Sequence, residues 1–188
     1  MAPKKKIQKR ILELRSQLWP EVTDDMLWLR KQQNGFTTIP RTLPLVMQIM
    51  DEMSDGAPVS KAYFDLWCRA FDECMVTLAK PREMAFHSGF TGQRAESAWR
   101  GRLRKLAEMG FIGLKPGPSG PESYALILNP HRVIARMKKD KAQSLTDAAY
   151  NALLERCGEV GATDLVVLEP PAPSPASFAL SLDDEVPF

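Results

Sequence analysis

The chain has 188 residues, 44% hydrophobic and 26% charged, which suits one domain of ordinary size with appendages. No run reaches the roughly 20 apolar residues of a membrane-spanning helix, and the basic start lacks the apolar segment of a secretory signal. Three cysteines without a Cys-x-x-Cys pair and two distant histidines argue against a disulfide scaffold and a zinc site. The sequence therefore indicates a soluble cytoplasmic protein with no metal or cofactor.

The charges are distributed unevenly along the chain. The net charge is only +2, but no Lys or Arg follows Arg156, and six of the 23 acidic residues lie from Glu159 onward. Residues 1–158 therefore hold all 25 basic and 17 acidic residues, a net charge of +8. A basic body joined to an acidic tail favours binding of nucleic acid or another polyanion.

Residues 1–40 read as a basic N-terminal helix followed by an irregular connection. Helical spacing of apolar residues within 4–18 predicts the helix, which could be either a packing helix or a basic arm that touches phosphates. A short helical piece is expected near 24–31, and Trp19 and Trp28 are expected to fill the core or pack against neighbouring elements. The apolar positions of the first helix are Ile7, Ile11, Leu14 and Leu18.

The folded domain is expected over residues 41–158 and begins with two helices. The first covers 42–53, and the turn DGAP separates it from a second helix over 59–78. Ser60 is a plausible N-cap of the second helix. Phe64, Trp67 and Phe71 recur at helical spacing and predict a buried stripe.

A short helix, a turn and a long helix follow. Pro81 favours the start of a helix that runs to about His87, and Gly89 supplies a tight turn. The long helix is expected over about 92–109, with Thr91 as its N-cap and Gly110 as its stop. One face of this helix is apolar, whereas the other is strongly positive. The apolar face consists of Ala95, Trp99, Leu103 and Leu106.

A β-hairpin and two more helices complete the domain. Strands are predicted at 111–115 and 122–128, joined by the loop PGPSGP. A short basic helix follows Asn129-Pro130. The last helix is expected over 144–158, between Ser144 as N-cap and Gly158 as stop. It would pack, through Ala148, Leu153 and Leu154, on the body or on a second copy of the chain, which would make a homodimer.

The segment MAFHSGFTGQRAESAWRGRLRKLAEMGFI, with the hairpin after it, resembles the winged helix-turn-helix superfamily. Ala85 and Gly89 stand where such domains need a small residue and a turn. The resemblance covers about 81–129, with the helix at 59–78 as the first of three. It implies a mainly α fold with a small β-hairpin wing, and a DNA-binding function for many of its members.

The positive face of the long helix supplies the candidate DNA-binding residues. Arg94, assisted by Gln93, is placed to read a base edge, since the arginine fork matches guanine O6 and N7. The expected phosphate contacts are Arg100, Arg104, Lys105 and the wing residue Lys115. The alternative is a solubilising helix face. The hypothesis requires that Arg94, Arg100 and Arg104 are not engaged in internal carboxylate pairs.

The tail divides into a tether and a tip. Residues 159–182 are rich in Pro and Ala and are expected to be disordered. The tip DDEVPF resembles the C-terminal tip of bacterial single-stranded DNA-binding proteins, which implies docking on proteins of replication, recombination and repair. An aromatic side chain would enter an apolar pocket and the acids would meet a basic rim. The expected partner-binding residues are Asp183, Asp184, Glu185, Val186, Pro187 and Phe188.

Together these features predict a DNA-binding adaptor of bacterial DNA replication, recombination or repair, with plasmids, phages or integrative elements as a natural home. Two alternatives stay open. One is a winged-helix transcription repressor, and the other is a module that sequesters a repair enzyme through its tip. The sequence contains no P-loop, no G-x-S-x-G and no convincing carboxylate pair, so an enzyme is not expected.

Overall fold

The computed structural model describes residues 2–166, and the chain divides into two units between Thr38 and Ile39. The first unit holds α1 (Ala2–Leu18) and a single 3-10 turn (Asp24–Met26). Its apolar residues are more exposed than expected: Trp19 is 53% and Trp28 64% exposed, so the prediction that they fill the core is wrong. Trp28 packs edge-on against Phe36, at 5.9 Å between ring centroids.

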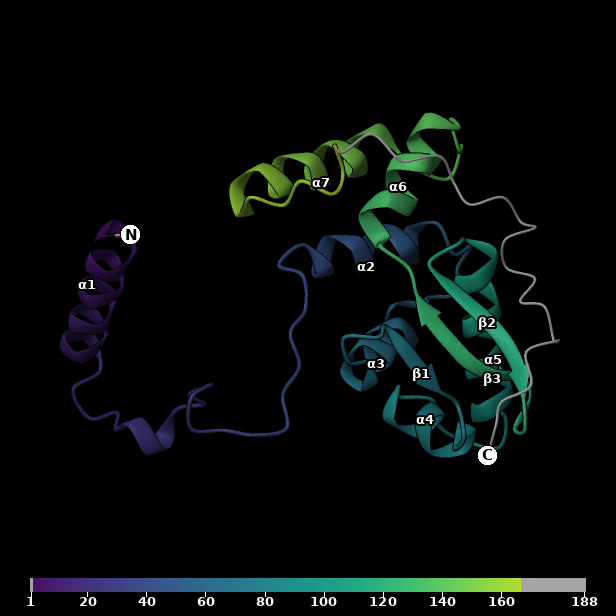
Figure 1. Cartoon of the computed structure of the whole chain (residues 1–188), viewed down its shortest axis with the longest axis horizontal. Coiled ribbons are helices and arrows are strands. Elements are labelled where there is room, and N and C mark those ends of the chain that lie inside the picture. Colours follow the sequence, from purple (N-terminus) through teal and green to yellow (C-terminus); the bar gives the residue numbers. More distant parts are fainter. Residues whose placement is uncertain (1, 167–188) are drawn as a thin grey trace, which may run out of the picture. The chain divides into compact units, whose positions relative to one another are not determined.

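The second unit is mainly helical with one small antiparallel sheet (Figure 1). Its helices are α2 (Leu43–Glu52), α3 (Ser60–Arg69), α4 (Pro81–His87), α5 (Ala95–Glu108), α6 (Pro130–Lys139) and α7 (Asp147–Val160). The strands are β1 (Met75–Thr77), β2 (Ile112–Gly117) and β3 (Gly120–Ile127), in the spatial order β1-β3-β2. Figure 1 shows the long β2–β3 hairpin beside α5, with α3 and α4 at one end of the body and α6 and α7 at the other.

The core confirms the predicted apolar face of α5. Trp99, Leu103 and Leu106 are completely buried and join Tyr63 and Phe111 in one cluster. Burial raises the pKa of Tyr63 to about 12, against a smaller lowering by its contact with Trp67. The opposite face of α5 is thereby fixed toward the outside of the second unit.

The predicted helix over 59–78 is wrong beyond Arg69. The α3 helix ends there, Cys74 adopts a left-handed backbone with a φ of 55°, and Met75–Thr77 joins the sheet beside β3. The expected buried stripe fails as well, because Phe71 is 83% exposed and Phe64 only partly covered. Tyr63 and Leu66 fill the core instead, since the helix turns a different face inward.

Capping also differs from the sequence expectation. Ser60 is the first residue of α3, and Asp51 of α2 caps the helix by accepting from the backbone nitrogens of Val59 and Ser60 at 2.7 and 2.8 Å. Neither Thr91 nor Ser144 is an N-cap: α5 begins after Arg94, and α7 is capped by Thr146. The two hydrogen bonds that Asp51 accepts tie α2 to α3 through one carboxylate.

The end of the last helix lies beyond the predicted stop. Gly158 lies inside α7, whose left-handed end residue is Gly161 at φ 72°. Leu153 is buried as expected, whereas Ala148 and Leu154 are exposed. The α7 helix therefore packs on the rest of the second unit through only part of its predicted apolar face.

The hairpin is tighter than predicted. Strand β2 continues through Pro116 to Gly117, and β3 begins at Gly120, so only two residues separate the strands. Gly117 is required at its position because a Cβ there would lie 2.5 Å from Cε2 of Tyr124. The close approach places the Tyr124 ring over the β2 backbone.

Candidate nucleic-acid interface

The predicted base-reading residues lie in the connection between α4 and α5. Gln93 and Arg94 are both exposed, and Arg94 immediately precedes α5 without making a side-chain cap bond. Within residues 2–166 the Arg94 guanidinium has no ion pair or hydrogen bond. Its five donors are therefore available to a molecule outside the chain.

Arg100 and Arg104, by contrast, share one buried carboxylate. Nη1 of Arg100 donates to Oε2 of Glu122 at 2.9 Å, and Nη1 of Arg104 donates to Oε1 of the same residue at 2.9 Å. Glu122 lies on β3 and is 7% exposed. The requirement that these arginines have no internal carboxylate pair therefore fails for two of the three.

The two arginines nevertheless differ in exposure. The Arg100 side chain is 18% exposed and also donates from Nε to Glu96 at 3.1 Å. Burial alone would lower its pKa, but the hydrogen bonds to Glu96 and Glu122 outweigh burial and raise it. Arg104 keeps 55% of its side chain exposed. Arg100 is thus a structural link between α5 and the hairpin, whereas Arg104 retains an outward surface.

Lys105 pairs with a carboxylate on the surface. Its Nζ lies 2.8 Å from Oδ2 of Asp55, which is 83% exposed on the turn after α2. The hydrogen bond to Asp55 is the main reason that the pKa of Lys105 is raised. Pairs this exposed are weak and screened by salt, so Lys105 can exchange its partner for a phosphate.

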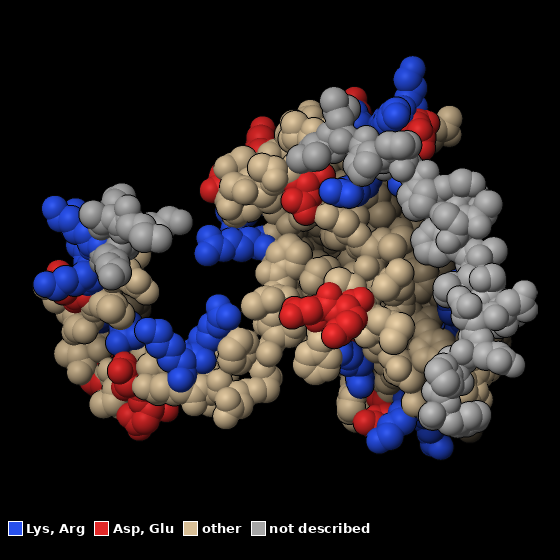
Figure 2. All heavy atoms as spheres, viewed as in Figure 1, with Lys and Arg blue, Asp and Glu red and all other residues tan. Residues whose placement is uncertain are grey.

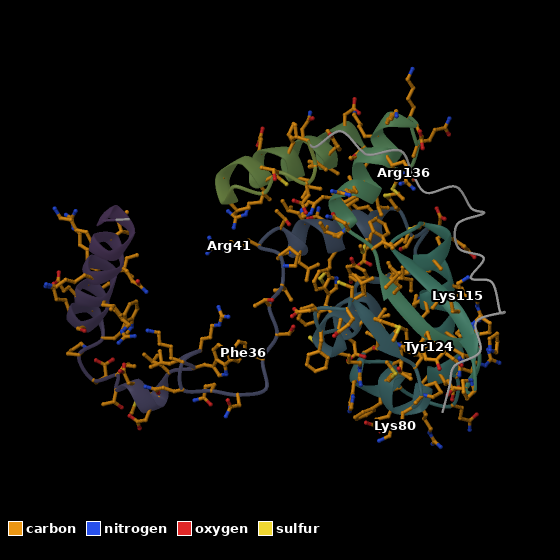
Figure 3. The ribbon with its side chains drawn as sticks, viewed as in Figure 1. Phe36, Arg41, Lys80, Lys115, Tyr124 and Arg136 are labelled. Carbon is orange, nitrogen blue, oxygen red and sulfur yellow. The ribbon has the colours of Figure 1, made fainter. Side chains whose placement is uncertain are left out.

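The hairpin contributes Lys115, which is exposed on β2 opposite Tyr124 of β3 (Figure 3). Both side chains lie on the face of the sheet that is turned away from the core. The two residues between the strands, Pro118 and Ser119, carry no charge. Any contact of this hairpin with an anion would therefore be made by its side, through Lys115, and not by its tip.

Sequence reasoning missed the basic residues at the start of α4. Lys80 and Arg82 flank Pro81 and are exposed, and Figures 2 and 3 place basic side chains, Lys80 among them, at the α4 end of the second unit. Lys80 is 3.3 Å from Glu83 in a surface pair. The available signal was the basic flank on both sides of the helix-starting proline.

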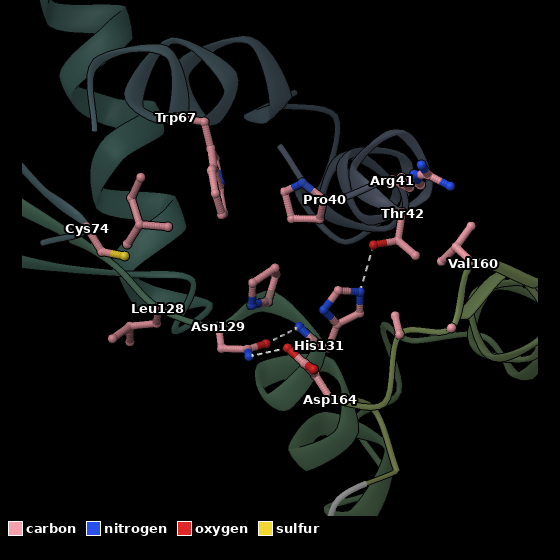
Figure 4. Close-up of a pocket in the computed structure, with 14 residues that line it drawn as sticks. Pro40, Arg41, Thr42, Trp67, Cys74, Leu128, Asn129, His131, Val160 and Asp164 are labelled. Carbon is pink, nitrogen blue, oxygen red and sulfur yellow. Dashed lines mark hydrogen bonds between the residues drawn. The ribbon is translucent and has the colours of Figure 1, made fainter. Parts of the chain in front are cut away.

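A largely apolar cavity of about 390 Å³ lies elsewhere in the second unit, between the ends of α2, α6 and α7 (Figure 4). At its edge Oγ1 of Thr42 lies 2.7 Å from Nε2 of His131, and both residues are buried. Burial lowers the pKa of His131, and the nearby Asp164 raises it by less. This contact joins α2 to α6, and none of the predicted interface residues lines the cavity.

Some of the predicted functional residues lie outside the part of the chain that the structure describes. Residues 183–188, the predicted partner-binding tip, and most of the predicted tether lie outside the described residues. Within 2–166, no group of three or more acidic, His or Cys side chains is placed to hold a metal ion. In the same range, no helix combines the length and apolar character needed to cross a membrane.

Comparison with family models, with curated proteins and with solved structures finds no match to this chain.

Proposed function

We propose that the protein is a DNA-binding adaptor built on a winged helix-turn-helix domain. The observation that carries the proposal is the exposed start of α5, where Gln93 and Arg94 have no partner within the described chain while the opposite helix face is in the core. Three helices, α3 to α5, followed by the β2–β3 hairpin also support the winged-helix assignment.

The proposed interface differs from the one that the sequence indicated. Arg94 and Gln93 remain the base-reading candidates, and Arg104, Lys105 and Lys115 remain phosphate contacts, joined by Lys80 and Arg82 of α4. Arg100 is assigned to the link with Glu122. In this proposal the tip at 183–188 recruits proteins of replication, recombination or repair.

The test is fluorescence anisotropy with single- and double-stranded oligonucleotides over a salt series. The full chain should bind at least one of them, and Arg94→Ala should lower affinity by about tenfold if Arg94 reads a base. Arg132→Ala removes another exposed arginine, on α6, and should change affinity little. Absence of binding to both oligonucleotides would eliminate the adaptor and the repressor together.

The sequestering module is favoured by one observation, the engagement of Arg100, Arg104 and Lys105 with carboxylates of the chain itself. It predicts negligible DNA affinity and capture of a repair enzyme by the tip. A pull-down from bacterial extract with the full chain and with Phe188 deleted checks the tip. Equal recovery of helicases, nucleases or primase by both proteins would remove the recruiting role in either proposal.

A further inference from the structure

A second surface cavity lies between α3 and the connection that leads to α5. Its volume is about 390 Å³, and it is separate from the residues predicted to contact DNA. Its wall combines apolar side chains with a cation, a carboxylate and an imidazole. The lining residues are Met47, Lys61, Phe64, Asp65, Cys68, His87, Ser88 and Gly89.

A chain of hydrogen bonds fixes the imidazole at this cavity. Nε of Arg69 donates to Oδ2 of Asp65 at 2.7 Å, and Nη2 of Arg69 lies 2.8 Å from Nδ1 of His87. A guanidinium can only donate, so Nδ1 of His87 accepts and the ring hydrogen is on Nε2. Within residues 2–166, the Nε2–H group has no acceptor.

The same chain of contacts leaves a lysine without a carboxylate. Asp65 is flanked on α3 by Lys61 one turn before it and Arg69 one turn after it, and it pairs with Arg69. Lys61 is exposed and has no ion pair within the described residues. Its Nζ lies 3.9 Å from the position that a Cβ on Gly89 would occupy, so the ammonium lies over the turn.

We infer that this cavity binds a phosphate oxyanion, with Nζ of Lys61 and Nε2–H of His87 as its donors. Both groups offer only hydrogens, which favours an anion over a cation as the occupant. The charge of Asp65 is balanced by Arg69, so Lys61 leaves the cavity with a net positive charge. Met47 and Phe64 provide carbon surface for the organic part of a phosphate ester.

The phosphate can come from the DNA backbone or from a free phosphate compound. The DNA source rests on the proposed function, and it is favoured by position, because the connection that carries Gly89 continues to Gln93 and Arg94. A backbone phosphate held here would fix the register of the base-reading end of α5.

The first experiment titrates the full chain with inorganic phosphate, against chloride at matched ionic strength, and follows backbone amide resonances by NMR. Phosphate should shift the amides of Ser88 and Gly89. Lys61→Met and His87→Phe should each weaken this binding by about fivefold or more, the equivalent of one charge-assisted hydrogen bond. His87→Gln keeps a donor near the position of Nε2 and should retain most of the phosphate affinity. Lys139→Met, another exposed lysine, should have no effect.

The second experiment measures DNA affinity of the same variants over a salt series. A backbone phosphate at this site predicts that Lys61→Met reduces the salt slope by about one, whereas Lys139→Met leaves it unchanged. An unchanged slope with phosphate binding intact would assign the cavity to a free phosphate compound. Shifts by phosphate in a chain that binds no DNA would support the cavity while removing the proposed function.

The inference is overturned if phosphate shifts no resonance near Gly89, or if Lys61→Met and His87→Phe bind phosphate as the unchanged chain does. Both substituted side chains are exposed, and thermal unfolding of each variant shows whether it is folded.

Discussion

Arg94 at the start of α5 and Arg100 in its middle belong to the same basic segment, yet their guanidinium groups have different surroundings. Arg94 is exposed and has no partner within the described residues, whereas Arg100 is 18% exposed and donates to Glu96 and Glu122. The same residue type therefore has two kinds of surroundings on one helix. The middle of α5 is joined to the hairpin through Glu122, whereas Arg94 at its start makes no such contact within the described residues.

The largest expected effect comes from removing the carboxylate that holds the middle of α5. Glu122→Ala leaves Arg100 without its buried partner, and we expect a loss of about 3 kcal/mol in the free energy of unfolding. Urea denaturation of the full chain measures it. Glu73→Ala, at an exposed loop position, is the matched control and should change stability little. Equal stability of the two variants would refute the structural role of Glu122.

Replacing Arg100 and Arg94 separately measures how far the two side chains differ in their effect on stability. Arg100→Ala should lower the free energy of unfolding by about 2 kcal/mol, because it removes one partner of Glu122 and the packing of a long side chain. Arg94→Ala should leave stability unchanged and act only on DNA affinity. Urea denaturation and anisotropy on the same two proteins check both. If Arg94→Ala destabilises the chain as much as Arg100→Ala, the start and the middle of α5 do not differ in this way.

Gly101, which follows Arg100 in the sequence, tests the outward face of α5. A Cβ at this position would meet nothing within 4 Å, so Gly101→Ala should stabilise the helix by about 1 kcal/mol. If α5 lies against DNA, the added methyl group should at the same time weaken binding. Thermal unfolding measures the change in stability, and anisotropy measures the change in DNA affinity. Higher stability with unchanged affinity would show that this face does not contact DNA.

The smallest effect is expected at the surface pair of Lys105 and Asp55. Asp55→Asn removes a highly exposed carboxylate, and its effect on the thermal midpoint should lie within experimental error. The same change frees Lys105 and should raise DNA affinity slightly at low salt. Anisotropy at low and high salt measures this gain, which should vanish as salt screens the charges. A gain that persisted at high salt would contradict the assignment of Lys105 to a phosphate.

Much of the secondary structure was predictable because its signals are local. The bounds of α4 follow from Pro81 and Gly89, and the buried face of α5 follows from the spacing of Trp99, Leu103 and Leu106. The end of α3 was not predictable in this way. Residues 70–78 are rich enough in apolar side chains to extend a helix, and only pairing with β3 makes Met75–Thr77 a strand.

The candidate site shows the same limit. Sequence alone identified the basic segment and the residue types that could contact DNA. The pairing of Arg100 and Arg104 with Glu122 was missed, because these residues are far apart in the chain and meet only when the hairpin packs on α5. Lys61 and His87 were missed for a similar reason, since the turn at Gly89 brings them to one cavity.

The amino-acid sequence was enough to predict a basic, mainly helical body, an apolar face on α5 and an acidic tail. Hydrophobic spacing and net charge are properties of the chain that folding does not change. Which basic side chains are paired depends on the folded arrangement and could not be predicted from the sequence. The charge of an arginine is fixed by its chemistry, but whether a carboxylate lies within hydrogen-bonding distance depends on the packing of segments distant in sequence.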